Sequence, residues 1–311
     1  MEMSFERAWN EMTGRQHHAF HMKVWDALGD PKERAENFRR LMTGELRLTV
    51  EEVARVLFDR HGRRIPPQGI KASVVDANRN FCLDQKVMKL ADYGLRLTLA
   101  AGYLGRSIAI DPEEFVDRTS ALRERIRGDE QLANLLHGVH LPIALPQIEI
   151  SDYGTALEEV FLPAVGRAYE IHFAGRKFHN GPQENLRGKV QVVGSHSQYL
   201  VAGLAEMPVV ALYFPTALQG FSAEAAREQM VTLPDRDRIL LAGALETAVA
   251  IVMYPDILAR DGQTPNLGCA AVTWQGYLPC FRARDGEFFF DAGVGNDGAC
   301  GGFSSGIVVL G

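Results

Sequence analysis

The hydrophobic and polar positions divide the chain into a mainly helical first part and a second part that mixes helix-like and strand-like patterns. In the first 140 residues, capping residues precede apolar positions at helical spacing, and a glycine follows each run. A further helix is expected over 84–105, although Gly94 weakens its pattern. Segment 62–80, with two adjacent prolines, is predicted as a long connection carrying a short strand at 70–75. The capped helices are predicted at 30–44, 49–62 and 111–128.

The second part follows a proline-containing junction at 141–147, which is either a domain boundary or an extended crossing. A helix is expected over 151–173, kinked or divided at Pro163 because proline lacks an amide hydrogen. A long apolar helix is expected from Asp235 to about Leu258. Runs rich in β-branched and aromatic residues predict strands at 190–193, 208–214 and 270–275.

The strongest local signal is a β-hairpin near the C-terminus. Asp285-Gly286 lies between the strand-like runs 278–283 and 287–290, and such a dipeptide favours a tight hairpin turn. A final strand is expected at 307–310. The pattern predicts an α/β or α+β protein in which a helical region, 1–140, packs on a mixed, partly antiparallel sheet in 141–311. The two regions are either separate or one continuous domain.

Composition narrows the class of protein. The chain has 311 residues, of which 46% are hydrophobic and 23% charged, so it can bury a full core. The net charge of −6 makes nucleic acid a poor partner. The start of the chain lacks a signal-peptide pattern, no apolar stretch is long enough to cross a bilayer, and four cysteines form no disulfide framework. We therefore expect a reduced, cytoplasmic protein with no membrane partner. The sequence names no cofactor.

The last 21 residues contain seven glycines around Cys300. Gly301 and Gly302 follow this cysteine, and their backbone amides could bind an anion or a developing oxyanion. Gly302–Gly306 matches the G-x-S-x-G pattern of a serine nucleophile, but no helix and no histidine follow it. Cys300 is therefore the candidate nucleophile, and the alternative is a small buried cysteine without chemistry.

Two histidines on predicted loops of the second part are candidate bases for Cys300. His196 directly follows the strand at 190–193, and His179 lies in a polar loop. The same loop carries Arg176 and Arg187, which could bind a phosphate or carboxylate, although surface loops often have this composition.

A second histidine group lies near the start of the chain. His17 and His21 are four residues apart and would share one face of a helix. Two imidazoles do not make a metal site, and a third ligand such as Glu11 or Asp26 would be needed. We predict no metal here and interpret the segment as a polar helix face.

Two short segments resemble known enzyme families. The run 300–310 is similar to the glycine-rich, cysteine-bearing end of thiolases, and 176–181 with 237–241 and 255–257 is similar to short stretches of carnitine acyltransferases. The duplicated architecture and second cysteine motif of thiolases are missing from the sequence, as is the His-x-x-x-Asp-Gly pattern of carnitine acyltransferases. The chain is assigned to neither family, and the resemblances only favour acyl transfer as a reaction class.

The sequence supports two hypotheses. The first is an acyl-transfer or hydrolytic enzyme acting on a small-molecule ligand, with Cys300 as nucleophile, His196 or His179 as base, and Gly301 and Gly302 as oxyanion donors. The alternative is a non-catalytic binding or assembly protein that forms a homo-oligomer. It is motivated by the lack of a complete catalytic motif, and by the apolar segment 239–254 and the terminal strand as possible interface elements.

Overall fold

The computed structural model describes residues 13–47, 56–77, 81, 83–181, 186–234, 238–295 and 298–311, without the side chains of 195–196 and 292–295. The chain forms two compact units, Met1–Ala54 and Arg55–Gly311. In the first unit, α2 (Gly14–Ala27) is capped by Thr13, whose hydroxyl accepts from Gln16 N while the Gln16 side chain accepts from Thr13 N. Helix α3 (Arg34–Met42) follows. Neither helix has a buried residue.

The helices of the second unit include several that the sequence predicted. Asp111 caps α5 and accepts from Glu114 N, and Pro163 stands in the first turn of α7 after a π-helical segment, Leu157–Phe161. The helices are α4 (Leu90–Leu104), α5 (Pro112–Arg127), the 3-10 helix η1 (Ala133–His137), α6 (Tyr153–Ala156), α7 (Leu162–His172), α8 (Ser195–Glu206), α9 (Ala223–Met230), α10 (Ala244–Met253) and α11 (Pro255–Leu258).

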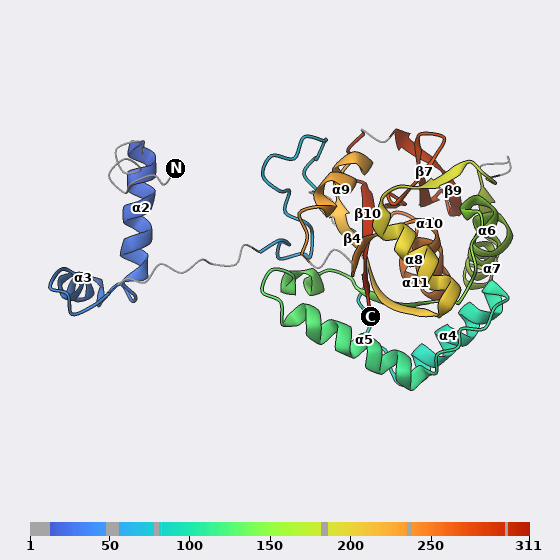
Figure 1. Ribbon diagram of the computed structural model, residues 1–311, viewed down its shortest axis with the longest axis horizontal. Coiled ribbons are helices and arrows are strands. Elements are labelled where there is room, and N and C mark those ends of the chain that lie inside the picture. The colour runs from blue at the N-terminus through green and yellow to red at the C-terminus, as the bar shows by residue number, and fades with distance from the viewer. Residues whose placement is uncertain are drawn as a thin grey trace. The chain divides into compact units, whose positions relative to one another are not determined.

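The described strands form one mixed sheet. They are β1 (Leu141–Leu145), β2 (Phe178–Asn180), β3 (Val190–Val192), β4 (Val209–Gln219), β5 (Ile239–Leu241), β6 (Asn266–Gly268), β7 (Val272–Trp274), β8 (Tyr277–Arg284), β9 (Glu287–Gly295) and β10 (Phe303–Leu310). Most pairs are antiparallel, whereas β10 pairs with β6 and β2 pairs with β9 in parallel. Strand β10 lies inside the sheet, between β4 and β6, and Figure 1 shows it beside β4. The predicted α+β class, with helices mostly early and strands mostly late, is confirmed.

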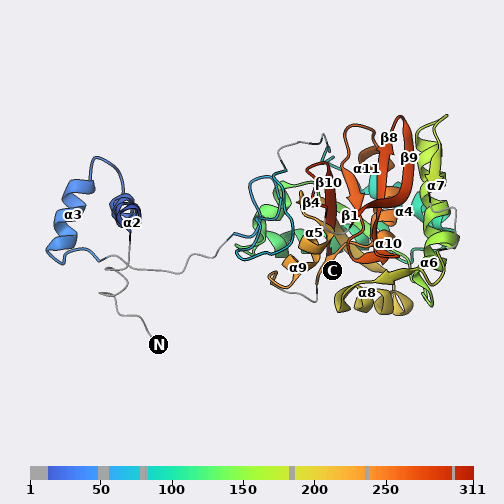
Figure 2. The same ribbon diagram turned by 90° about the horizontal axis from the view of Figure 1, so that it is seen from above.

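Strands β8 and β9 form the predicted hairpin. Asp285 and Gly286 have φ values of 55° and 77°, as a tight turn with two left-handed residues requires. Strand β9 continues the sheet through β2, and α7 covers this edge (Figure 2).

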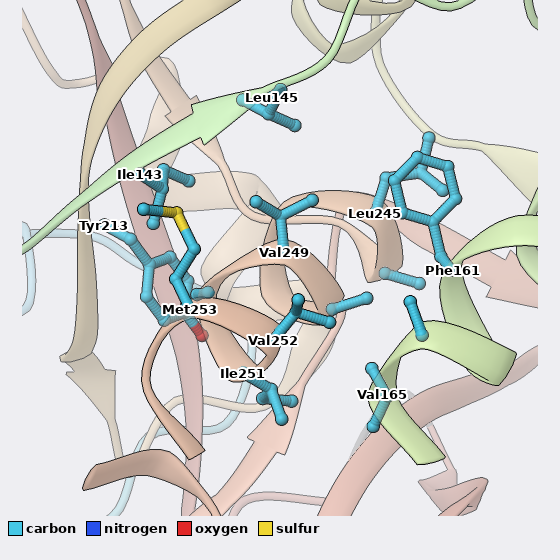
Figure 3. Packing of buried hydrophobic residues seen from close by; sticks show 14 of the residues in the cluster. Ile143, Leu145, Phe161, Val165, Tyr213, Leu245, Val249, Ile251, Val252 and Met253 are labelled. Carbon is cyan, nitrogen blue, oxygen red and sulfur yellow. The ribbon is translucent and has the colours of Figure 1, made fainter. Parts of the chain in front are cut away.

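Helix α10 is the centre of the main core. All ten of its residues are buried, and it packs against α4, α7 and β1. Figure 3 shows the surrounding cluster, in which Met253 lies beside Ile143 of β1 and Tyr213 of β4. A helix that is apolar on all sides is expected only where protein covers every face.

Three predicted elements differ from the structure. The expected helix from Asp235 to Leu258 is instead strand β5, helix α10 and helix α11, because the chain turns into α10 at Gly243. Within the predicted helix 49–62, residues 49–55 lie outside the described residues, and Phe58 forms a bridge with Arg64 rather than a helical turn. The predicted strand 70–75 is reduced to a single bridge, Val74 to Phe221.

The junction at 141–147 contains β1, which is fully buried and pairs with β4.

Candidate functional site

The Cys300 loop connects β9 to β10, and the Cys300 side chain is exposed. Three successive carbonyl groups of this loop accept hydrogen bonds, and the last two of them connect the loop to other segments of the protein. Phe303 N donates to Cys300 O at 3.0 Å, Gln219 Nε2 donates to Gly301 O at 2.7 Å, and Asn266 N donates to Gly302 O at 3.0 Å. The loop is therefore a built part of the fold.

These carbonyl bonds also set the direction of two amide groups. In a trans peptide the N–H points opposite to the C=O of the preceding residue, and the described chain has no cis peptide bond. The Gly301 amide therefore points away from Phe303, and the Gly302 amide points away from Gln219. Amides with this orientation can donate to an oxyanion, as predicted. A loop held in place through its amides could not offer these donors.

A cleft of about 430 Å³ lies beside the loop. Gln219 and Asp76 line it and also reach the loop, since a Cβ on Gly301 would lie 3.2 Å from Asp76 O. Asp59 and Arg63 line the cleft as well. Arg63 Nη1 donates to Ala77 O at 2.6 Å, which holds its cation at the cleft wall.

The structure does not bring His179 to Cys300. His179 is in β2, where its Nε2 lies 2.9 Å from Glu287 Oε2 and its ring stacks on Phe289 at 4.9 Å between centroids. Along the sheet, β2 is separated from β10 by β9, β8 and β6. Four strand spacings amount to about 19 Å, which is too far for proton transfer between His179 and Cys300.

His196 is near the start of α8, and its side chain lies outside the described residues. The backbone around it is nevertheless placed. Val193 N donates to Ala271 O, Ala271 N to Ala242 O, and Ala242 N to Gly306 O, so this loop faces the middle of β10. Gly306 is four residues along β10 from Gly302, or about 13 Å. The backbone at 193 therefore approaches β10 well away from Cys300.

Arg176 lies in the loop between α7 and β2, and Arg187 lies between β2 and β3. Arg176 stands over the Phe173 ring, with its guanidinium carbon 5.3 Å from the centroid. Arg187 Nε donates to Thr155 Oγ1 at 3.0 Å, and its Nη2 is 3.9 Å from Glu159 Oε1. Residues 182–185 between the two arginines lie outside the described residues.

The early histidines, His17 and His21, are both on α2. Of their suggested third ligands, Asp26 pairs with Arg34 at 3.1 Å, and Glu11 lies outside the described residues. In the part of the chain that the structure describes, no group of three or more His, Cys, Asp or Glu side chains could hold a metal ion.

A buried polar cluster at the start of α10 was missed by the sequence analysis. Gly243 N donates to Glu246 Oε2 at 3.0 Å, and Leu245 N donates to the Tyr153 hydroxyl at 3.1 Å. A Cβ on Gly243 would lie 2.8 Å from both of these oxygens, so glycine is required here for space. We define the α10 polar cluster by its side chains, which are those of Tyr153, Tyr213, Glu246, Thr247 and Cys269.

Burial controls the ionisation of this cluster. It raises the pKa of Glu246 to about 7, although hydrogen bonds from two backbone amides oppose the shift. Burial also raises the pKa of Tyr153, Tyr213 and Cys269, and the Glu246 carboxylate adds to each increase. Cys269 is therefore held as a thiol, which makes it a poor nucleophile.

One sequence signal could have revealed the cluster. Glu246 is the single charged residue in the apolar run 239–254, and a carboxyl group inside a fully buried helix needs a structural or chemical reason. The other members come from α6, β4 and the turn after β6, and no local pattern unites them.

Comparison of the chain with protein-family models, with curated proteins and with solved structures finds no match. None of the helices in the described ranges has the length and apolar character that crossing a bilayer would require.

Proposed function

We propose that the protein is an enzyme of the acyl-transfer or hydrolytic type whose nucleophile is Cys300. The supporting observation is the Cys300 loop itself, in which an exposed thiol is followed by two glycine amides directed away from their loop-fixing neighbours. The cleft beside the loop could accept a small acyl substrate, and its wall carries Arg63 and Arg64 together with Asp59 and Asp76.

The chemistry divides into two steps. The Cys300 thiolate attacks the substrate carbonyl and forms a C–S bond, and the leaving group departs with a proton. Water or another acceptor then attacks the thioester, releases the acyl group and returns the thiol. The amides of Gly301 and Gly302 stabilise the oxyanion in both steps. Because His179 is four strands away and the His196 side chain lies outside the described residues, the thiol proton passes to solvent water in this proposal.

Thiol alkylation tests the nucleophile. In a Cys82→Ser background, iodoacetamide should modify Cys300 at neutral pH, while Cys269 and Cys280 serve as internal controls because both are buried. We expect Cys300 to react faster than free cysteine, as an activated nucleophile does. Equal rates for Cys300 and free cysteine would contradict an activated nucleophile.

Catalysis is tested with a p-nitrophenyl ester and a short-chain thioester. The protein should hydrolyse at least one of them with a burst of product equal to the enzyme concentration, and Cys300→Ser should remove the burst. Turnover that survives in Cys300→Ser would show that the thiol is not the nucleophile.

A second proposal, that the chain forms a homo-oligomer, is supported by the first unit. Its helices expose five large apolar side chains, whereas Leu28 is the one buried hydrophobic residue among 13–47. The exposed residues are Phe20, Met22, Trp25, Phe38 and Met42. The elements first suggested as interfaces do not support it, because α10 is fully buried and β10 is an inner strand.

Light scattering tests this assembly. The full chain should be an oligomer at micromolar concentration, and the double variant Phe20→Ser/Met42→Ser should be a monomer. Val87→Ser is the matched control, since Val87 is an exposed apolar side chain in the second unit. A monomeric full chain, or an oligomer that survives the double substitution, would count against the proposal.

A further inference from the structure

A cavity of about 460 Å³ lies between α5 and the end of β10, and three arginines line it. Arg118 and Arg125 belong to α5 and lie two turns apart on one side of the helix, about 10.5 Å along its axis. Arg238 directly precedes β5. None of the described residues that line the cavity is acidic. The lining is completed by Ala121, Leu122 and Gly311.

Backbone contacts at the end of β10 bring these arginines together. Arg125 Nη2 donates to Leu310 O at 2.8 Å, and Leu310 N donates to the backbone oxygen of Arg238 at 2.8 Å. The next residue, Gly311, donates to Val210 O at 3.0 Å. The positive charge at this cavity is therefore produced by tertiary contacts between distant segments, and no run of basic sequence indicates it.

The charge of the cavity wall contrasts with that of the whole chain, which is −6. Charges of one sign repel each other, so three arginines around one cavity favour an anion among them. Arg118 Nη2 is 2.6 Å from Glu114 Oε1, but both side chains of this pair are about 40% exposed, so water weakens the attraction. The exposed Arg238 side chain makes no hydrogen bond or ion pair within the described residues.

We propose that this cavity, the α5 arginine site, binds the phosphate group of a phosphate monoester. Such a group carries up to two negative charges and three acceptor oxygens at neutral pH, and guanidinium groups match phosphate oxygens with paired N–H donors. Three arginines suit this anion better than a carboxylate, which has a single charge and two oxygens. Ala121 and Leu122 provide apolar contacts for the organic part of the ester.

The α5 arginine site is independent of the proposed Cys300 enzyme site. Cys300 precedes the first residue of β10, whereas the arginines surround the end of this strand, and eight residues of strand span about 26 Å. Binding of phosphate here involves no bond to carbon and no redox step. Either proposal can therefore fail while the other holds.

Calorimetric titration with phenyl phosphate at constant ionic strength tests the binding. One molecule should bind per chain, and benzoate should bind about tenfold more weakly or not at all. Arg238→Gln should weaken phenyl phosphate binding by about tenfold, because it removes a charged donor. Arg106→Gln is the matched control, since Arg106 is exposed and lies after α4, away from the lining residues. Equal losses in both variants would reduce the effect to net charge and overturn the proposal.

A pair of substitutions on α5 tests the cavity itself. Ala121→Glu places a carboxylate among the arginines and should prevent binding of phenyl phosphate. Ser120→Glu adds the same charge at a neighbouring exposed position outside the lining, and it should keep most of the binding. If Ala121→Glu binds as well as the wild type, the ligand is not in this cavity.

Backbone amide chemical shifts locate the bound phosphate. Phenyl phosphate should shift the amides of Ala121 and Gly311 and leave those of Gly301 and Gly302 unchanged. Shifts centred on Gly301 and Gly302 would place the anion at the Cys300 loop instead. A titration without saturable binding would show that groups of the chain itself occupy the arginines, and either result would overturn the α5 arginine site.

Discussion

Helices α2 and α10 differ in what surrounds them. Helix α2 has 14 residues and none is buried, while α10 has ten residues and all are buried. An isolated helix shorter than about 12–15 residues is marginal in water, so α10 depends on its core contacts. Helix α2 has a capping box and exposed aromatic side chains instead. Charged side chains of α2 are solvated by water, whereas Glu246 of α10 is buried. The ionisation of Glu246 is therefore controlled by the protein around it.

Removing core contacts from α10 should have the largest effect. Ile251 is completely buried, and Ile251→Ala should lower the free energy of unfolding by about 2–5 kcal/mol because it leaves a cavity. In α2, Met22 is 45% exposed, and Met22→Ala should change it by about 0.5 kcal/mol or less. Urea denaturation of both variants measures the difference. Similar losses would show that α2 is also part of a packed core.

The buried carboxyl of α10 should make stability depend on pH. The pKa of Glu246 is raised from 4.5 to about 7, so between these values the unfolded chain ionises while the folded protein keeps its proton. Stability is therefore greatest below about pH 4.5 and falls as the pH rises to about 7, by about 3 kcal/mol. Glu246→Gln should remove this fall, because glutamine does not ionise. Urea titrations at several pH values measure it, and an unchanged slope in the variant would assign the effect to other groups.

The ion pairs of Asp256 with Arg96 and Lys86 lie just after α10. Their contribution to stability should fall as the pH falls, whereas that of Glu246 falls as the pH rises. Burial opposes ionisation of Asp256, but hydrogen bonds from Arg96 and Lys86 outweigh it and lower its pKa to about 2. Stability from this pair is present above about pH 4 and is lost as the pH falls to about 2. Asp256→Asn should cost about 2 kcal/mol at neutral pH and reduce the acid dependence.

The matched control is Glu36→Gln in α3. The Glu36 pair with Arg39 is highly exposed, so its loss should have little effect on the unfolding midpoint. Equal effects of the Asp256 and Glu36 substitutions on unfolding would refute the role of burial in the Asp256 pair.

Local signals explain which elements the sequence could predict. The Asp111 cap and the Asp285-Gly286 turn act over a few residues, and both α5 and the β8–β9 hairpin form as expected. Strand β5 pairs with β10, about seventy residues later. The sequence alone does not show this partner, so the segment 235–258 was predicted as one helix. Tertiary pairing thus overrides local periodicity at this point.

For the candidate site as well, the sequence indicates local features but not contacts between distant segments. The glycines around Cys300 allow either a built loop or a loose tail, and the strand-like run at 307–310 favoured the loop. The distance from Cys300 to His179 depends on the order of strands between β10 and β2, which no local pattern encodes. The α10 polar cluster likewise joins Tyr153 to Glu246, residues more than ninety positions apart.

The smallest effect is expected at the cap of α2. The Thr13 hydroxyl accepts from Gln16 N at 3.3 Å, and Thr13→Ala should cost about 1 kcal/mol of helix stability. Because α2 has no buried residue, this loss should increase amide hydrogen exchange in α2 alone and leave exchange in α10 unchanged. Thr13→Ser keeps the acceptor and should exchange like the wild type. Exchange that rises equally in both helices would show that α2 and α10 unfold as one cooperative unit, contrary to the difference in their surroundings.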